Sequence, residues 1–303
     1  MKILDLIFAG RPLLHLPVWS IYLVSLHYHL ELSGESFARQ DLLTLVLLSL
    51  LSAGAYYLNQ IHDVESDDYN RKLGFLQRGY VTERGLILAF VITSAVPLVA
   101  AFFVSRALLF IFAQLLVLSY LYSAPPARLK DRAFLGLIAN AYSFGFLIPF
   151  TVMPDFNQHT AGLLGWDNPL YFFLAVASIY LMTTIPDREG DRAAGKRTLG
   201  VVWAPFAVKI IAMVLMLLAA AVAFRSNYSL LFYVALISLL PMVFCVILAV
   251  PPLERMAAKL PILLLTLLAG GFFPLYFVFL VVLFVATRIY YVKRFEFVYP
   301  RLM

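Results

Sequence analysis

The sequence predicts an all-α integral membrane protein, a bundle of nine transmembrane helices that forms a single transmembrane domain over residues 1–303. Three observations support this prediction. Only 13% of the 303 residues are charged, against roughly 25% in a typical soluble domain. Hydrophobic residues make up 63% of the chain, and its mean hydropathy is +0.89. They fall in apolar runs that approach or exceed the roughly 20 residues that a helix needs to cross about 30 Å of hydrocarbon.

Short clusters of charge separate these runs. The nine expected spans are 12–31, 41–61, 84–105, 107–123, 134–154, 168–186, 201–224, 229–250 and 261–291. The last run is too long for one straight crossing and too short for two crossings with a turn. Gly270, Gly271 and Pro274 favour one long kinked helix there. Lys209, about two turns into the seventh span, is expected to snorkel its amine toward the membrane surface.

Lys and Arg are distributed unequally between the two sides of this layout. Of 23 such residues, fifteen lie in the N-terminal segment and in the loops after the second, fourth, sixth and eighth spans. Seven lie on the other side. Four of these seven form the basic tail, which nine crossings would place there: Arg288, Lys293, Arg294 and Arg301. Cytoplasmic loops are enriched in Lys and Arg. We therefore expect a multi-pass protein of the cell membrane with a cytoplasmic N-terminus and cytoplasmic charged loops.

The net charge of +6 is explained by this topology. No basic run with interleaved exposed aromatic residues occurs, so the sequence argues against nucleic-acid binding. The single cysteine, Cys245, lies inside an apolar run and excludes both an internal disulfide and a cysteine metal cluster.

Acidic residues gather at the cytoplasmic ends of the second and sixth expected spans. Seven of the seventeen lie in two short stretches: Asp63, Glu65, Asp67 and Asp68, and then Asp187, Glu189 and Asp191. Asn59, Asp63 and Asp67 are spaced four apart, so on a continued helix they share one face. Asp187 and Asp191 repeat this spacing.

Carboxylates held side by side near a membrane surface repel one another, and a divalent cation removes that conflict. Oxygen ligands without cysteine favour Mg²⁺, which binds one or two carboxylates together with substrate phosphates. Two such clusters on one side therefore predict a clamp for a diphosphate. The alternative, two solvated loops with incidental acids, does not account for the repeated spacing.

Basic and aromatic residues lie on the same side. Pro125 and Pro126 end the fourth span, next to Tyr122 and Ser123, which we expect to face the site. Candidate phosphate-binding residues follow the spans: Arg78, Arg128, Lys130 and Lys196. Their alternative role is ordinary anchoring of the cytoplasmic loops, with tyrosines in an interfacial belt.

These motifs resemble those of the UbiA superfamily of intramembrane prenyltransferases, which includes the 4-hydroxybenzoate and homogentisate prenyltransferases. Asn59-x-x-x-Asp63-x-x-x-Asp67 resembles the first aspartate-rich motif of that family. Asp187-Arg-Glu-Gly-Asp191, with the downstream Gly195 and Thr198-Leu199, resembles the second. Tyr122-Ser123-x-Pro125-Pro126 resembles the segment that ends the family's fourth helix. The stretch 70–83 differs, since it lacks the usual prolines and carries Arg71, Lys72 and Arg78.

The resemblance implies an Mg²⁺-dependent prenyltransferase. Asn59 and the four aspartates would hold Mg²⁺ against the diphosphate of a polyprenyl donor, with Lys130 and Arg128 adding positive charge. Neutralising the diphosphate lets the allylic C–O bond ionise, and tyrosine rings such as Tyr122 stabilise the carbocation. The polyprenyl tail would lie in an apolar cavity open to the lipid bilayer. The residues of the first motif, Asn-Gln-Ile-x-Asp-Val-Glu, are most similar to those of the homogentisate branch of the family.

We expect an aromatic acceptor, as in the biosynthesis of quinones and related prenyl lipids. A second interpretation keeps the same donor but uses a non-aromatic acceptor, a glycerophosphate or a sugar phosphate. A third is a cation-coupled membrane transporter. A transporter is expected to carry charges near the bilayer midplane or in broken helices, whereas these acids cluster at one surface.

Overall fold

The computed structural model of the protein describes residues 2–64, 74–153, 165–248 and 250–300. This part of the chain holds helices and no β-strand, which confirms the all-α prediction. In chain order the elements are α1 (Lys2–Ala9), η1 (Pro12–His15), α2 (Leu16–Ser33), α3 (Arg39–His62), α5 (Glu83–Val104), α6 (Arg106–Ser123), η2 (Leu129–Asp131), α7 (Ala133–Asn140), η3 (Ala141–Leu147), α8 (Ile148–Phe150), α10 (Asp167–Thr184), α11 (Arg188–Ala193), α12 (Leu199–Val202), α13 (Pro205–Arg225), α14 (Ser229–Leu248), α15 (Pro251–Phe272) and α16 (Pro274–Phe295). Of the η elements, η1 and η2 are 3-10 turns and η3 is π-helical.

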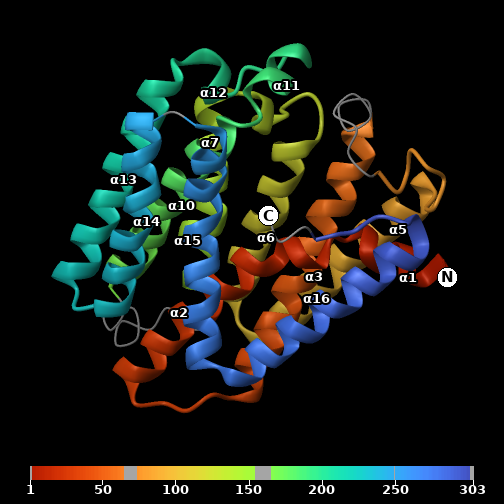
Figure 1. Cartoon of the computed structure of the whole chain (residues 1–303). Helices are drawn as coiled ribbons and strands as arrows, with labels where there is room; N and C mark the ends of the chain where they lie inside the picture. The colour runs from red at the N-terminus through yellow and green to blue at the C-terminus, as the bar shows by residue number, and fades with distance from the viewer. Residues whose placement is uncertain (1, 65–73, 154–164, 249, 301–303) are drawn as a thin grey trace.

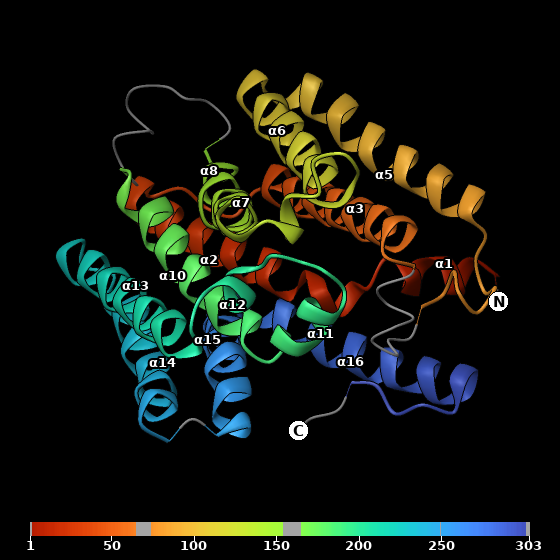
Figure 2. The ribbon, with the colours of Figure 1, turned by 90° about the horizontal axis from the view of Figure 1, so that it is seen from above.

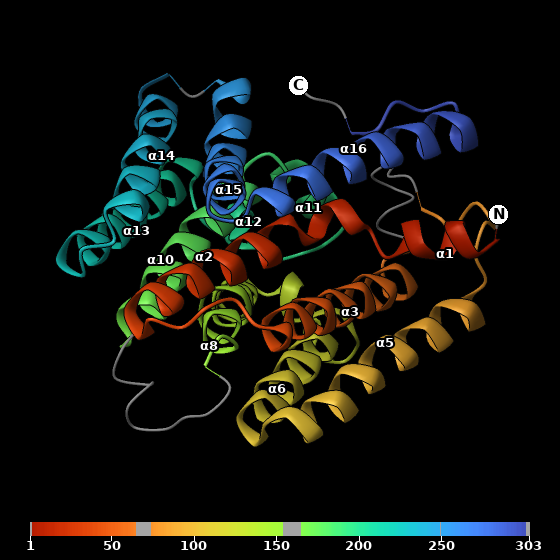
Figure 3. The same cartoon turned by 90° about the horizontal axis from the view of Figure 1, so that it is seen from below.

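The helices surround α10 (Figure 1). This helix packs against α13, η3, α7 and α15. Seen from above, the pair α13 and α14 and the pair α5 and α6 lie on opposite flanks, while the short helices α11 and α12 lie over the middle (Figure 2). From below, α2 crosses the bundle beside α16, and the rings of Trp19 and Phe279 lie 5.3 Å apart where the two helices meet (Figure 3).

Local capping explains where several helices begin and end. The hydroxyl of Thr82 accepts a hydrogen bond from the amide of Gly85 at the start of α5. The hydroxyl of Ser105 does the same for the amides of Ala107 and Leu108 at the start of α6. Such caps satisfy amide groups that have no partner within the helix. The starts of α5 and α6, which these caps fix, lie within a residue or two of the expected span boundaries.

Nine described helices are long and apolar enough to cross a membrane, as many as the sequence predicts. The set differs from the expected one in two places. The expected span 168–186 forms α10, which is not among the nine because its first turn holds the polar pair Asp167 and Asn168. The second difference is the last apolar run.

The prediction of one long kinked helix at 261–291 is wrong, since two helices, α15 and α16, occupy this region. Phe273 separates them in an extended conformation, with φ −127° and ψ 84°. Pro274 follows as the first residue of α16. Proline has no amide hydrogen to continue a helix and disfavours a helical conformation of the preceding residue, so the chain breaks here where a kink was expected.

This break also corrects the placement of the basic tail. A further crossing brings the end of α16 back to α1, where the guanidinium of Arg294 lies 3.1 Å from the buried carboxylate of Asp5. The tail therefore lies beside the N-terminal segment, and the expectation that it lies on the opposite side is wrong. Arg301 lies outside the described residues.

Lys209 does not snorkel to the surface, contrary to the expectation from the sequence. Its side chain is 5% exposed, and its Nζ lies 2.6 Å from Oε1 of Glu254 on α15. The same amine donates a hydrogen bond of 3.2 Å to the carbonyl of Cys245 on α14. Lys209 therefore ties α13, α14 and α15 together at one end of the bundle.

Replacing Lys209 by Met should destabilise the protein, because Glu254 would keep a buried charge without its partner. Breaking a buried ion pair from one side costs about 3–5 kcal/mol of unfolding free energy. Thermal unfolding of the purified protein in detergent measures this loss. The double variant K209M/E254Q removes both charges and should recover most of the lost stability, whereas a single variant as stable as the wild type would restore the snorkelling interpretation.

Candidate active site

The first cluster of the site forms where α3 ends beside the turn that follows α6. Asp63 caps the end of α3, and its amide donates to the carbonyl of Asn59. The hydroxyl of Ser123, the last residue of α6, donates a hydrogen bond to the side-chain oxygen of Asn59. The chain then turns through Arg128, which has the left-handed φ of 38°, into η2. This turn brings Lys130 back toward α3.

Lys130 links the residues of this cluster. Its Nζ lies 2.5 Å from Oδ1 of Asp63 and 3.3 Å from Oδ1 of Asn59. Nη2 of Arg128 lies 3.5 Å from the same Asp63 oxygen, and its Nε donates to Asp131 at 2.7 Å. Burial, the larger effect, lowers the pKa of Lys130, while the neighbouring carboxylate of Asp63 opposes this shift. Two cations thus lie against one carboxylate, an arrangement that suits an anionic ligand.

The second cluster lies on α11 and the turn after it. Asp187 is the exposed residue at the N-terminal end of α11. One oxygen of Asp191 accepts a hydrogen bond from the hydroxyl of Thr198 at 3.0 Å, and the other lies 3.6 Å from Nζ of Lys196. Gly195, with a φ of 71°, makes the reversal that folds Lys196 back onto α11. The second cluster therefore repeats the pairing of an aspartate with a lysine.

A backbone contact joins the two clusters. The amide of Arg197 donates to the carbonyl of Asp131 at 2.9 Å, so the turn after α11 pairs with the turn after α6. Below this contact, the side chain of Tyr122 lies close to Tyr180 on α10 and to Asn140 on α7, and all three line one cavity. Asp63 lies within electrostatic range of Tyr122, and Asp191 within range of Tyr180. Asp63 and Asp191 thus lie toward the same end of the bundle.

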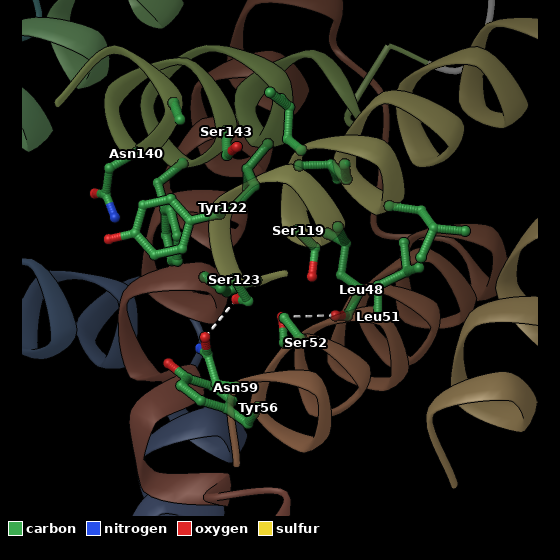
Figure 4. A pocket seen from close by; sticks show the side chains of 18 residues that line it. Leu48, Leu51, Ser52, Tyr56, Asn59, Ser119, Tyr122, Ser123, Asn140 and Ser143 are labelled. Atoms are coloured by element: carbon green, nitrogen blue, oxygen red, sulfur yellow. Dashed lines mark hydrogen bonds between the residues drawn. The ribbon is translucent and has the colours of Figure 1, made fainter. Parts of the chain in front are cut away.

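Two cavities extend from this point into the bundle, with volumes of about 310 and 600 Å³. Both are lined by Tyr56, Tyr122, Asn140 and Phe144. Asn59 and Ser123 line the smaller cavity near the first cluster, and the side chains of Tyr122 and Asn140 lie next to each other on one side of it (Figure 4). The walls of both are mainly apolar side chains, which is suitable for a hydrocarbon tail.

The structure brings together most of the residues that the sequence singles out. Asn59, Asp63, Tyr122, Ser123, Arg128, Lys130, Asp191 and Lys196 lie in the two clusters or at the cavity below them. Asp67 lies outside the described residues. Arg78 is exposed, and no hydrogen bond or ion pair between described residues joins it to either cluster.

The oxygen donors present fit Mg²⁺ held jointly with a substrate. Within the described ranges, no three His, Cys, Asp or Glu side chains lie close enough to hold a metal ion by themselves. Asp63, Asp187 and Asp191 supply carboxylates, and Asn59 supplies an amide oxygen. Magnesium typically binds one or two protein carboxylates and completes its shell with phosphate oxygens and water. These donors could therefore hold Mg²⁺ only together with an anionic ligand.

Sequence reasoning missed two residues of the site. These are Asn140 on α7 and Tyr180 on α10, which lie with Tyr122 at the larger cavity. Tyr180 carries no local signal, because its place at the site depends on the approach of Tyr122 from α6. Asn140 carried no such signal, because its position depends on the widened π-helical turn of η3 that follows it.

A comparison with protein-family models matches residues 18–260 to the UbiA prenyltransferase family. This chain belongs to the UbiA prenyltransferase family. The match covers the helices and turns that carry both acidic clusters. It confirms the resemblance inferred from the motifs and supports the expectation that the protein is a prenyltransferase.

Among characterised UbiA-related enzymes, the chain is similar to the chloroplastic 2-acyl-4-prenylphloroglucinol 6-prenyltransferase of Humulus lupulus. The two are 30% identical over 179 residues. The matched region covers 55% of this chain and 42% of the plant enzyme, so the chain matches less than half of the length of that relative.

Solved structures confirm the UbiA fold. A digeranylgeranylglyceryl phosphate synthase superimposes with a TM-score of 0.67 at 18% identity, over 88% of this chain and 96% of that one. A UbiA homologue from Archaeoglobus fulgidus bound to GPP and Mg²⁺ superimposes with a TM-score of 0.62 at 18% identity, over 90% and 99% of the two chains. Similarity at this level of identity shows a shared fold.

Replacing Gly136 by Ala should disturb the junction of the two clusters. A Cβ at this position would lie 2.5 Å from the hydroxyl of Tyr180 and 3.0 Å from the carbonyl of Leu129, the residue before Lys130. A displacement of about 1 Å at a reactive centre can lower turnover about 100-fold. We expect a loss of about 10- to 100-fold in a prenyl-transfer assay, normalised to folded protein.

The matched control is Gly271→Ala on α15, where no atom lies within 4 Å of the added carbon. This variant should retain the activity of the wild type. Equal turnover of the two variants would show that the close approach at Gly136 does not matter for the site.

Proposed function

We propose that this protein transfers a prenyl group from an isoprenoid diphosphate to an acceptor, with Mg²⁺ as cofactor. One observation carries the proposal: two aspartate and lysine pairs, joined through the turns after α6 and α11, lie at the opening of apolar cavities lined by tyrosines. The family of the chain and the GPP and Mg²⁺ in the Archaeoglobus fulgidus homologue support this assignment.

In this proposal the first cluster and the second cluster bind opposite sides of a diphosphate. Asn59, Asp63, Asp67, Asp187 and Asp191 hold Mg²⁺, which supplies positive charge to the leaving diphosphate. Lys130 and Arg128 now neutralise Asp63, and Lys196 neutralises Asp191. A diphosphate bound with its metal would take over these cations as partners, because phosphate oxygens accept charge-assisted hydrogen bonds from Lys and Arg. Ser123 and Arg78 are proposed to add polar contacts to the donor.

The proposed reaction separates charge and then forms a new bond. The allylic C–O bond breaks, and the diphosphate leaves with the electron pair. The rings of Tyr122 and Tyr56 line both cavities, and an aromatic ring facing an allylic cation there would stabilise it by about 2 kcal/mol once water is excluded. A nucleophilic carbon or oxygen of the acceptor attacks the cation, and the acceptor then loses one proton.

The surroundings of the site support a membrane enzyme with an apolar donor. The cavities open among helices that are long and apolar enough to cross a bilayer. We propose that residues 1–303 form one transmembrane domain whose donor tail lies in these cavities. The excess of Lys and Arg on the site's side supports a cytoplasmic N-terminus and cytoplasmic active-site loops. The described acids Asp63, Asp187 and Asp191 lie at helix ends, which favours this function over a transporter.

For the acceptor we propose an aromatic compound. The plant relative is named for prenylation of an acylphloroglucinol, which is an aromatic ring. The cavity of about 600 Å³ is lined by several aromatic rings, which would pack against such an acceptor: Tyr56, Tyr122, Phe144, Tyr171, Phe172, Tyr180, Phe284 and Tyr299. A more specific form of this proposal is that the prenylated aromatic product belongs to quinone biosynthesis.

Product analysis tests this function directly. The purified protein in lipid nanodiscs is mixed with C5 to C20 isoprenoid diphosphates, Mg²⁺ or EDTA, and three acceptors: an acylphloroglucinol, homogentisate and a glycerophosphate. We expect a prenylated aromatic product that requires Mg²⁺. A product with the glycerophosphate alone would overturn the aromatic acceptor and keep the donor. Ion flux in liposomes without any prenylated product would overturn the enzyme.

Asp63→Ala and Asp187→Ala should each lower turnover to less than roughly a tenth of the wild type, because each removes a carboxylate from the proposed metal site. Steady-state kinetics with saturating Mg²⁺ measures the loss. The control is Asp167→Asn at the opposite end of α10, where the carboxylate pairs with Arg225 away from both clusters. Activity above that level in either alanine variant would argue against metal-assisted ionisation.

A further inference from the structure

Asp5 is the most deeply buried of the acidic side chains that form ion pairs in the described part of the chain, although it lies in the first turn of α1. Only 1% of the residue is exposed. Its Oδ1 accepts hydrogen bonds from the hydroxyl of Tyr290 at 2.6 Å and from Nε of Arg294 at 3.1 Å, and its Oδ2 accepts from Nη2 of Arg294 at 3.1 Å. Phe8, one turn further along α1, stacks on Tyr290 with ring centroids 3.8 Å apart. The start of the chain is thus fixed to the end of α16.

The same end of α16 holds the segment that precedes α5. The guanidinium carbon of Arg294 lies 4.5 Å from the ring centroid of Tyr80. Phe295 makes edge contacts with Tyr80 at 4.8 Å and with Phe75 at 5.5 Å. Phe75 is 2% exposed. A cation over an aromatic face and well-packed ring edges stabilise this chain segment, which lies outside the long helices.

The helix α1 and the segment that precedes α5 also contact the end of α3, next to Asp63. On α3, the hydroxyl of Tyr57 donates to the carbonyl of Leu6 at 3.1 Å, and the amide of Gln60 donates to the carbonyl of Ala9. These residues lie within two turns of Asp63. From the other side, Nε2 of Gln77 donates to the carbonyl of Val64, the residue after Asp63, at 3.1 Å.

We infer that α1 and the end of α16 form a terminal clamp, defined by Asp5, Phe8, Tyr290, Arg294 and Phe295, which positions Asp63 for metal binding. The inference rests on the proposed function, because it gives Asp63 that role. The clamp residues lie apart from both clusters and act only through their contacts with α3 and with residues 74–82. They are positioning residues that hold the segments on both sides of the Asp63 carboxylate.

Hydrogen–deuterium exchange of the full-length protein in detergent tests the clamp without any activity assay. Asp5→Asn keeps the shape of the side chain and removes its charge from Tyr290 and Arg294. In this variant the peptide covering residues 74–82, whose Tyr80 and Val81 amides donate to the carbonyl of Phe75, should exchange about tenfold faster. The matched control is Asp167→Asn, which breaks another Asp–Arg pair that does not contact this segment.

Unchanged exchange in Asp5→Asn would overturn the clamp, as would faster exchange that also appears throughout α10 and α13. A second pair of variants covers the case in which Asp5→Asn does not fold. Tyr80→Phe keeps a ring under Arg294, whereas Tyr80→Leu removes it and leaves the Asp5 pair intact. Faster exchange of residues 74–82 in Tyr80→Leu but not in Tyr80→Phe supports the clamp, and equal exchange in the two contradicts it.

The Mg²⁺ dependence of turnover then tests what the clamp positions. Loss of a group that orients a metal ligand typically costs about 10- to 100-fold in metal affinity or activity. In Asp5→Asn and Tyr80→Leu the Mg²⁺ concentration for half-maximal turnover should rise about tenfold or more, with kcat at saturating Mg²⁺ nearly unchanged. A fall in kcat without a shift in Mg²⁺ dependence would overturn positioning of the metal ligand. If the wild type shows no prenyl transfer, the proposed function fails, while the exchange data still decide whether the clamp exists.

Discussion

The cost of a charge among membrane helices constrains this structure more than any other single interaction. An ionised group shielded from water is tolerated when an opposite charge lies against it and its remaining hydrogen bonds are made. Four such pairs are seen in the described part of the chain: Asp5 with Arg294, Asp63 with Lys130, Asp191 with Lys196, and Lys209 with Glu254. Three of these pairs join segments far apart in the chain, whereas Asp191 and Lys196 close the turn after α11.

The four pairs differ in the kind of element, a long helix or a short turn, on which the basic residue lies. Arg294 and Lys209 lie on the long helices α16 and α13, so the packing of those helices holds their backbones in place. Lys130 lies on the short turn η2, and Lys196 follows the short helix α11. A lysine on a turn can change partners at the cost of a few side-chain torsions. This difference separates the pairs that stabilise the fold from those that an incoming diphosphate could take over.

Much of the fold and of the site followed from the sequence because apolar length and acidic spacing are local signals. The turns at Asp63 and Asp187 were found in this way. The break at Phe273 was missed because a proline that follows two glycines is compatible both with a kink in one helix and with a turn between two helices. Only the packing of the surrounding helices decides which of the two forms. Lys209 was misjudged since its partner, Glu254, lies 45 residues further along the chain. Tyr180 was missed because its role depends on the approach of α6, which no local pattern encodes.

The end of α16 connects the clamp to the chemistry. Beyond Arg294 the chain continues to Tyr299 and Pro300, which line the cavity of about 600 Å³. Tyr299 also contacts Tyr291, with ring centroids 4.7 Å apart, within the aromatic cluster that holds α16. An allylic cation reacts with water unless the site is closed to it. The segment that fixes the position of the first cluster therefore also supplies part of the wall that keeps water from the cavity, so both requirements of the proposed reaction depend on the same packing of α1 against α16.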